Sequence, residues 1–210
     1  MSARQTSIRV LSVDDHPLLR EGIASLLAGQ DDLHLVAEAS NGREAVEQFR
    51  AHRPDVTLMD LQMPEMNGVE AMIAIRAEFP GARIVMLTTF EGDVEIQRAL
   101  EAGAYGYVLK NTPPRELVQV IQQVNAGKKR IPSEVAARLA EHMSDETLTP
   151  REIDVLKEVA GGNRNRDIGK RLFISEETVK VHIKHIMDKL SAKDRTEAIA
   201  IAVRRGIIQL

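Results

Sequence analysis

Short apolar runs alternate with longer segments of helical periodicity through the first 126 residues of the chain. The apolar runs contain few polar residues, which is typical of strands covered on both faces. They fall at Ile8–Val13, Leu33–Ala39, Val56–Met59, Ile84–Leu87 and Gly106–Leu109. The helical segments are Pro17–Ala28, Arg43–His52, Val69–Phe79, Val94–Ala102 and Arg115–Val124. Five strand–helix repeats predict an α/β fold, a doubly wound five-stranded parallel sheet.

Two of these helices begin with an Asn–x–x–Glu sequence, from Asn41 to Glu44 and from Asn67 to Glu70. This spacing is typical of a capping box, in which each side chain accepts a hydrogen bond from the backbone N–H of the other residue. We therefore expect a capping box at the start of both helices.

The pattern changes after residue 126. The polar residues 127–146 predict a linker, helical in part over Ser133–His142. Beyond the linker the apolar spacing is helical throughout, which predicts a small all-α domain of four helices at residues 147–210. The first of these helices has a capping box from Thr149 to Glu152. The others are expected over Arg166–Leu172, over Glu176–Leu190 and from a capping box at Asp194–Glu197 to Arg205.

Composition and charge limit which cellular compartment and which binding partners are expected for the protein. The 210 residues include no Cys, which excludes disulfides, thiolate catalysis and Cys-ligated metals. No apolar run approaches the roughly 20 residues that span a bilayer, and Met1–Gln5 carries no secretory signal, so we expect a cytoplasmic protein without a membrane partner. The net charge is −5 over residues 1–144 but +5 over residues 163–205. This asymmetry suggests different partners for the two parts.

Polar side chains follow four of the predicted strands. Asp14 and Asp15 follow the first strand, Asp60 the third, Thr88 ends the fourth and Lys110 follows the fifth. The carboxyl ends of parallel strands meet at one edge of a sheet, so these side chains should converge there. Three converging carboxylates repel one another unless a cation is present, and oxygen ligands suit Mg²⁺.

Such a set of groups suits phosphoryl transfer to a carboxylate. Lys110 is expected at a solvent-exposed rim, where its replacement should leave the fold intact. His16, directly after the acidic pair, is expected to be a surface residue at the start of a helix, since Asp14 and Asp15 already fill the role of metal ligands.

Four motifs in this part of the chain resemble the receiver domain of bacterial two-component response regulators. They are Val13-Asp14-Asp15, Met59-Asp60 through Gly68, Leu87-Thr88-Thr89 and Gly103 through Lys110. The resemblance implies that residues 1–126 form a receiver domain in which a histidine kinase phosphorylates Asp60. It further implies Mg²⁺ ligands at Asp14, Asp15, Asp60 and the Leu61 backbone, phosphoryl contacts from Thr88 and Lys110, and an aromatic switch at Tyr107 that turns inward with Thr88.

The third helix of the last part has two distinct faces. One face is apolar and should be core, while the other is polar apart from Val181. The apolar face holds Val179, Ile183, Ile186 and Leu190; the outward face holds Glu177, Val181, Lys184, His185 and Asp188, with Lys180 beside them. The short connection before this helix predicts a helix-turn-helix. The outward face then suits a DNA major groove, where Lys reaches phosphates or guanines and Val a thymine methyl.

Three sequences here resemble the LuxR-type helix-turn-helix domain: Leu148–Leu156, Ile174–His182 and Lys189–Ala198. Together with the receiver motifs, they make the whole chain similar to the NarL/FixJ branch of response regulators. The resemblance implies groove contacts from Lys180, Val181 and Lys184. The segment Asn163–Asp167 departs from the usual family sequence, and its Arg164 and Arg166 are expected to contact phosphates.

The preferred function is a phosphorylation-controlled transcription regulator that binds double-stranded DNA and forms a homodimer on phosphorylation or on DNA. A phosphohydrolase with Asp60 as nucleophile is the first alternative, but Gln62 stands where such enzymes carry an acid. We therefore expect only self-phosphorylation from small donors and slow autodephosphorylation. The second alternative, an adaptor without a DNA role, is disfavoured by the basic outward face.

Overall fold

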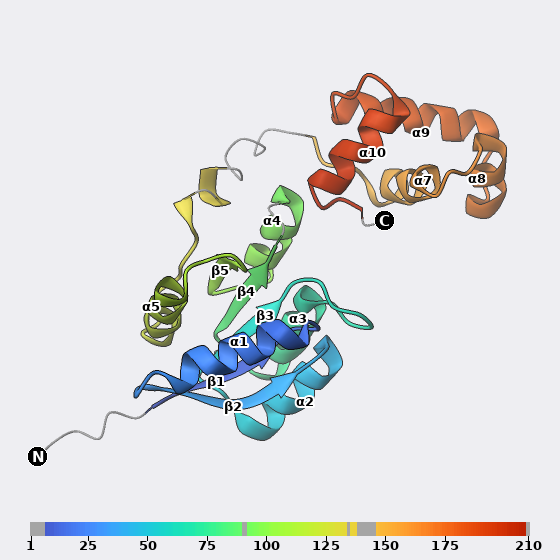
Figure 1. The fold of residues 1–210 in the computed structure, drawn as a ribbon. Helices are drawn as coiled ribbons and strands as arrows, with labels where there is room; N and C mark the ends of the chain where they lie inside the picture. The colour runs from blue at the N-terminus through green and yellow to red at the C-terminus, as the bar shows by residue number, and fades with distance from the viewer. Residues whose placement is uncertain (1–6, 90–91, 134, 138–145, 209–210) are drawn as a thin grey trace, which may run out of the picture. The chain divides into compact units, whose positions relative to one another are not determined.

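The computed structural model describes residues 7–89, 92–133, 135–137 and 146–208. The chain divides into two compact units, one built around a β-sheet and the other containing the last helices (Figure 1). None of the helices among these residues is long and apolar enough to cross a bilayer.

The first unit contains one sheet of five parallel strands, as the sequence predicted, and the structure gives their order as β2-β1-β3-β4-β5. The first two strands are β1 (Ile8–Val13) and β2 (Leu33–Ala39), and the other three are β3 (Val56–Asp60), β4 (Ile84–Thr88) and β5 (Gly106–Leu109). β3 and β4 are each one residue longer than predicted. Asp60 and Thr88 are therefore the last residues of their strands, which fixes both at the same edge of the sheet.

Five helices accompany the strands: α1 (Pro17–Ala28), α2 (Gly42–His52), α3 (Gly68–Glu78), α4 (Asp93–Glu101) and α5 (Pro114–Asn125). Side chains of α1 and α5 belong to one core cluster, so these two helices cover the same face of the sheet. The strand residues of that cluster, such as Leu58 and Val85, alternate with Met59 and Met86, which are also fully buried. Both faces of the sheet are therefore covered, as in a doubly wound fold.

The second unit contains α7 (Pro150–Ala160), α8 (Asn165–Leu172), α9 (Glu176–Lys189) and α10 (Arg195–Arg204) around a core of its own. Phe173 is the C-cap residue that follows α8, and its φ of 56° turns the chain toward α9. A Cβ atom on Gly169 would lie 2.7 Å from the Ile174 carbonyl oxygen, so the turn packs too closely on α8 for any larger residue. This connection gives the helix-turn-helix that the sequence predicted.

Two of the predicted capping boxes are present. At α3, Asn67 accepts a hydrogen bond from the Glu70 N–H and Glu70 accepts one from the Asn67 N–H. At α7, Thr149 and Glu152 form the same reciprocal pair. These helices therefore begin where the sequence placed their caps.

The capping boxes predicted for α2 and α10 were wrong in one respect. Asn41 caps α2 and Asp194 caps α10, but the Glu side chains do not return to these residues. Glu44 instead accepts hydrogen bonds from the N–H and hydroxyl of Ser40, and Glu197 accepts from the N–H of the residue before Asp194. Each Glu side chain reaches one residue further back than a capping box requires.

The predicted linker begins as an extension of the sheet. The Arg130 N–H donates to the Tyr105 carbonyl at 2.9 Å, and the Arg130 carbonyl accepts from the Tyr107 N–H at 3.0 Å. The start of the linker therefore lies along the outer edge of β5, which the sequence did not indicate. Residues 133 and 135–137 are helical, and the rest of the helix predicted over Ser133–His142 lies outside the described residues.

Candidate functional site

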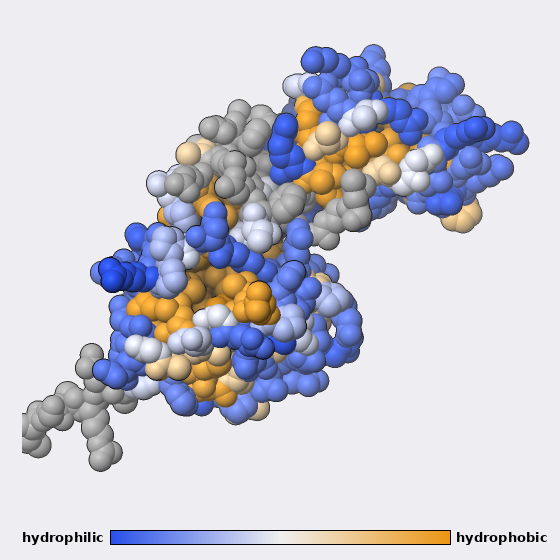
Figure 2. Space-filling model, in the orientation of Figure 1, coloured by the Kyte–Doolittle hydropathy of each residue, from blue (hydrophilic) through white to orange (hydrophobic). Residues whose placement is uncertain are grey.

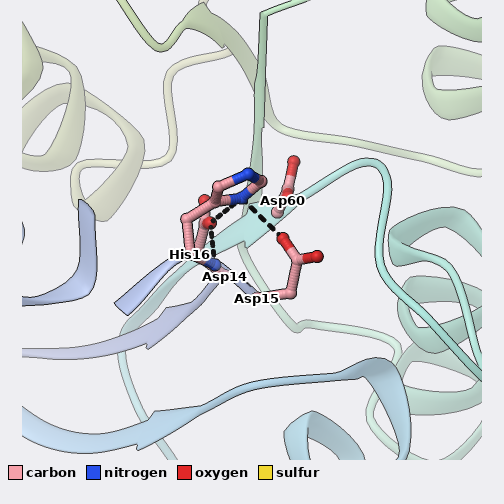
Figure 3. Close-up of side chains that lie close together, drawn as sticks. All are labelled: Asp14, Asp15, His16 and Asp60. Atoms are coloured by element: carbon pink, nitrogen blue, oxygen red, sulfur yellow. Dashed lines mark hydrogen bonds and ion pairs between the residues drawn. The ribbon is translucent and has the colours of Figure 1, made fainter. Parts of the chain in front are cut away.

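The carboxylates predicted to converge lie together at the carboxyl edge of the sheet (Figure 3). Asp14 follows β1 and Asp60 ends β3, and these strands pair directly, with Val13 opposite Met59. One oxygen from each of Asp14, Asp15 and Asp60, together with a ring nitrogen of His16, lie within 4.8 Å of one another. The parallel pairing of β1 and β3 is the cause, because it brings two acidic strand ends to adjacent positions.

Lys110 lies inside this cluster, not at a solvent-exposed rim as predicted. Its side chain is only 10% exposed, and its Nζ is 2.7 Å from Asp14 Oδ2 and 2.9 Å from Asp60 Oδ2. The sequence placed Lys110 correctly after β5 but gave no measure of its burial. Because Lys110 pairs with two buried carboxylates, its replacement is now expected to cost stability.

Burial and neighbouring charges set the protonation of the site. Burial, and to a lesser extent the charge of Asp14, raise the pKa of Asp60 while the hydrogen bond from Lys110 lowers it, and the net result is a pKa of about 6. Burial on its own would lower the pKa of Lys110, but its contacts with Asp14 and Asp60 outweigh that effect and the pKa is raised. A pKa of about 6 leaves Asp60 mostly ionised at neutral pH. Three carboxyl groups meet here against the one ammonium of Lys110, which favours an added cation.

The donor atoms fit a hard divalent cation such as Mg²⁺. Carboxylate oxygens are its usual protein ligands, and Asp14 and Asp60 are almost fully buried while Asp15 is accessible at 32% exposure. The Leu61 carbonyl, which was predicted to assist, accepts a hydrogen bond from the Gly68 N–H at 3.0 Å. It has one further lone pair available.

Gly68 ends the sequence motif that begins at Met59-Asp60, but the reason for a glycine at this position appears only in the structure. A Cβ atom at this position would lie 2.0 Å from the Asp60 carbonyl oxygen, which no side chain could tolerate without a shift of the backbone. The loop that follows Asp60 is thus held tightly against the end of β3. Gly68 therefore positions the acidic site.

Thr88 and Tyr107 lie on the strands next to Asp60. Thr88 ends β4, is 2% exposed, and its carbonyl accepts a hydrogen bond from the Lys110 N–H at 2.7 Å. Tyr107, on β5, is fully buried, so its ring occupies an inward position. The structure thus brings Thr88, Lys110 and Asp60 to the same edge and Tyr107 onto the neighbouring strand.

In the second unit, α9 is held by apolar packing and by one buried ion pair. Val179 and Ile186 are buried, and Glu152 of α7, which is 4% exposed, is 2.9 Å from Lys189 Nζ. Burial would raise the pKa of Glu152, but hydrogen bonds from Thr149 and Lys189 outweigh it and lower the pKa. These contacts fix the inner face of α9 and leave its outer face to solvent.

The outer face of α9 presents the residues that the sequence predicted. Val181 is 46% exposed, and Lys180 and Lys184 are exposed on either side of it. Lys180 Nζ is 3.2 Å from Glu177 Oε2. Arg164, which precedes α8, and Arg166 are also exposed. The surface over α8 and α9 is mostly hydrophilic (Figure 2).

The sequence predicted His16 only as a surface residue at the start of a helix, but the structure also places its ring at the acidic site. Its side chain is 70% exposed, as a surface residue should be, yet its Nδ1 is 2.7 Å from Asp15 Oδ1 and 3.3 Å from Asp14 Oδ1. The position next to the acidic pair was the only available signal.

A doubly wound sheet with an acidic edge, followed by a helix-turn-helix unit, is the architecture of a two-domain regulatory protein. Residues 10–122 match the response regulator receiver domain, and residues 146–202 match the bacterial regulatory proteins of the luxR family. The chain belongs to the two-component response regulators with a LuxR-type DNA-binding domain. This membership confirms the predicted function class and fold.

The similarity to known proteins extends over nearly the whole chain. The transcriptional regulatory protein YxjL of Bacillus subtilis is 39% identical over 96% of this chain and 98% of its own length. The response regulator ChrA of a heme-sensing two-component system is 38% identical, with a TM-score of 0.59 over 96% of this chain and 99% of its own. A structure of two RcsB dimers bound to two parallel DNAs is 25% identical, with a TM-score of 0.69 over 95% and 99%.

Proposed function

We propose that a sensor histidine kinase controls DNA binding by this protein through Mg²⁺-dependent phosphorylation of Asp60. The observation that carries the proposal is the Asp60 carboxylate itself. It is buried at the end of β3, lies 2.9 Å from Lys110 Nζ, and shares the edge of the sheet with Asp14 and Asp15. A buried carboxylate among further acidic ligands and one cation suits phosphoryl transfer.

Each group has a separate role in the transfer. An ionised Asp60 oxygen forms a bond to phosphorus while the bond from phosphorus to the kinase histidine breaks. Asp14, Asp15, Asp60 and the Leu61 carbonyl hold Mg²⁺, which when bound neutralises charge on the phosphoryl oxygens. The ammonium of Lys110, which contacts Asp60, adds a positive charge beside the phosphoryl group. The protein also accepts phosphoryl groups from small donors and hydrolyses its acyl phosphate slowly, but it turns over no other substrate.

Thr88 and Tyr107 respond to the negative charge of the phosphoryl group on Asp60. The Thr88 hydroxyl contacts the phosphoryl group, and the Tyr107 ring is held inward when Thr88 does so. Support for the Thr88 contact comes from the place of Thr88 at the end of β4, next to Asp60 at the end of β3. Two positions of one aromatic ring give the receiver two states that phosphorylation can bias.

DNA is read by α9 in the major groove. Lys180, Val181 and Lys184 contact the groove, while Arg164 and Arg166 contact phosphates. All five side chains are exposed, which supports this assignment. The receiver comprises residues 1–126, the linker residues 127–146 and the DNA-binding domain residues 147–210.

The active form is a homodimer that acts in the cytoplasm. The related RcsB structure is described as dimers bound to DNA. Two copies of one helix-turn-helix can read two half-sites at once, which increases both affinity and specificity. Phosphorylation or DNA therefore favours pairing.

The proposal is tested by labelling the full-length protein with a small phosphodonor. Wild-type protein should acquire one acid-stable, base-labile phosphoryl group when Mg²⁺ is present and none after chelation. Asp60→Asn should acquire none, whereas Asp31→Asn, at an exposed position in the same unit, should label like the wild type. Undiminished labelling of Asp60→Asn would contradict the assignment.

A further inference from the structure

His16 directs a nitrogen donor into the acidic site. Its backbone N–H donates to Asp14 Oδ1 at 2.9 Å, and it is the residue that precedes the first residue of α1. Its ring extends back over the two carboxylates, with Nδ1 between Asp15 Oδ1 at 2.7 Å and Asp14 Oδ1 at 3.3 Å (Figure 3). The Nδ1 atom of His16 and one oxygen each of Asp14 and Asp15 therefore lie close to one another.

These separations match those between neighbouring ligands of a metal ion. Two donors at right angles, each about 2.1 Å from an ion, lie about 3 Å apart. The Nδ1 of His16 stands at such a distance from both acidic side chains. The ring is also mostly exposed, so an ion can reach it from solvent.

The two oxygens of Asp14 face different partners. Oδ2 contacts Lys110, while Oδ1 faces His16. The ion pair with Lys110 therefore does not use Oδ1, the oxygen of Asp14 that faces His16.

We infer that His16 is a ligand that adapts this site to a borderline metal such as Co²⁺ or Zn²⁺. Imidazole nitrogen suits these ions, whereas an all-oxygen set suits Mg²⁺. The inference rests on the proposed function, because Asp14, Asp15 and Asp60 are its proposed Mg²⁺ ligands. A site with His16 holds a borderline metal more tightly than the carboxylates alone would, and such a metal competes with Mg²⁺ where Asp60 is phosphorylated.

The test uses the full-length protein and the metals Co²⁺ and Mg²⁺ alone. Binding of Co²⁺ is followed by its visible absorption, and binding of Mg²⁺ by calorimetry. His16→Asn should weaken Co²⁺ binding at the Mg²⁺-competed site roughly tenfold or more while changing Mg²⁺ affinity less than about twofold. His34→Asn, at an exposed position on β2, should change neither affinity.

Folding does not confound the comparison. His16 makes no side-chain cap to α1, and Asn is a favourable residue at that position, so thermal unfolding of His16→Asn should match or exceed that of the wild type. Equal Co²⁺ affinity in His16→Asn and wild type would overturn the inference, as would equal losses for Co²⁺ and Mg²⁺. The proposed function is checked separately, because Mg²⁺-dependent labelling of Asp60 does not require His16 as a ligand.

Discussion

The acidic site and the outer face of α9 are built in opposite ways. Asp14, Asp60 and Lys110 come from three different strand ends, and their side chains are at most 10% exposed. Lys180, Val181 and Lys184 come from one turn of one helix and are exposed. In the first region the charges that are proposed to perform the chemistry are buried and paired, so they are also expected to affect stability. In the second region binding is separate from folding, because packing is confined to the inner face of the helix.

The largest effect is expected at Gly68. Gly68→Ala should destabilise the first unit by more than about 3 kcal/mol and suppress labelling, because the new Cβ would lie 2.0 Å from the Asp60 carbonyl oxygen. The matched control is Gly22→Ala in α1, where no atom lies within 4 Å of the added Cβ. Gly22→Ala should instead gain about 0.5–1 kcal/mol, as usual for a helix interior. Urea unfolding measures both, and equal behaviour of the two variants would show that Gly68 does not constrain the site.

Lys110 comes next. Lys110→Ala should cost about 3 kcal/mol of stability at neutral pH without Mg²⁺, because Asp14 and Asp60 lose their common partner while remaining buried. Mg²⁺ should restore part of the loss. Lys129→Ala, at an exposed position, should be neutral within about 0.5 kcal/mol. An unfolding curve for Lys110→Ala that coincides with the wild type would mean that the ion pairs contribute nothing.

Asp60→Asn should stabilise the protein at neutral pH when no Mg²⁺ is present. The pKa of Asp60 is raised to about 6, so the native state binds a proton between about pH 4 and 6 that the unfolded chain does not. Wild-type stability therefore falls as pH rises through this window, and Asn avoids the loss. The gain should be about 1–3 kcal/mol above pH 6 and should shrink toward pH 4.

Thermal unfolding of Asp60→Asn and wild type across this pH range measures the difference. A difference that does not change with pH would show that Asp60 titrates normally. Saturating Mg²⁺ should reduce the gain, because the ion stabilises ionised carboxylates in the native wild type.

The smallest effects on stability are expected on α9. Val181→Ala, Lys180→Ala and Lys184→Ala should each leave the unfolding temperature of the second unit nearly unchanged, since these side chains do not enter its core. Their effects should appear on DNA. Val181→Ala should relax preference at one base pair. Each Lys→Ala change should either lower the log–log salt slope by roughly 1 or remove roughly 1–3 kcal/mol of discrimination at one guanine.

Binding isotherms at several salt concentrations, on specific and scrambled duplexes, separate these outcomes. If all three variants bind both duplexes as the wild type does, α9 is not the reading element. Arg164 and Arg166 would then be the first residues to examine.

The sequence predicted the fold and the three carboxylates of the acidic site because both follow from short-range patterns. Apolar runs fixed the strands, and the strand ends placed Asp14, Asp60 and Thr88 at one edge. The burial of Lys110 could not be predicted, because it depends on how side chains from separate strands pack. The same is true of the Arg130 contact with β5 and of the direction in which the His16 ring points.

We propose that phosphorylation of Asp60 controls how the outer face of α9 engages DNA. The most direct measurement compares specific DNA binding by wild type and Asp60→Asn, each with and without Mg²⁺ and a small phosphodonor. We expect the donor to change the DNA affinity of the wild type and to leave that of Asp60→Asn unchanged. The same change in both proteins, or no change in wild type that is shown to be labelled, would contradict it.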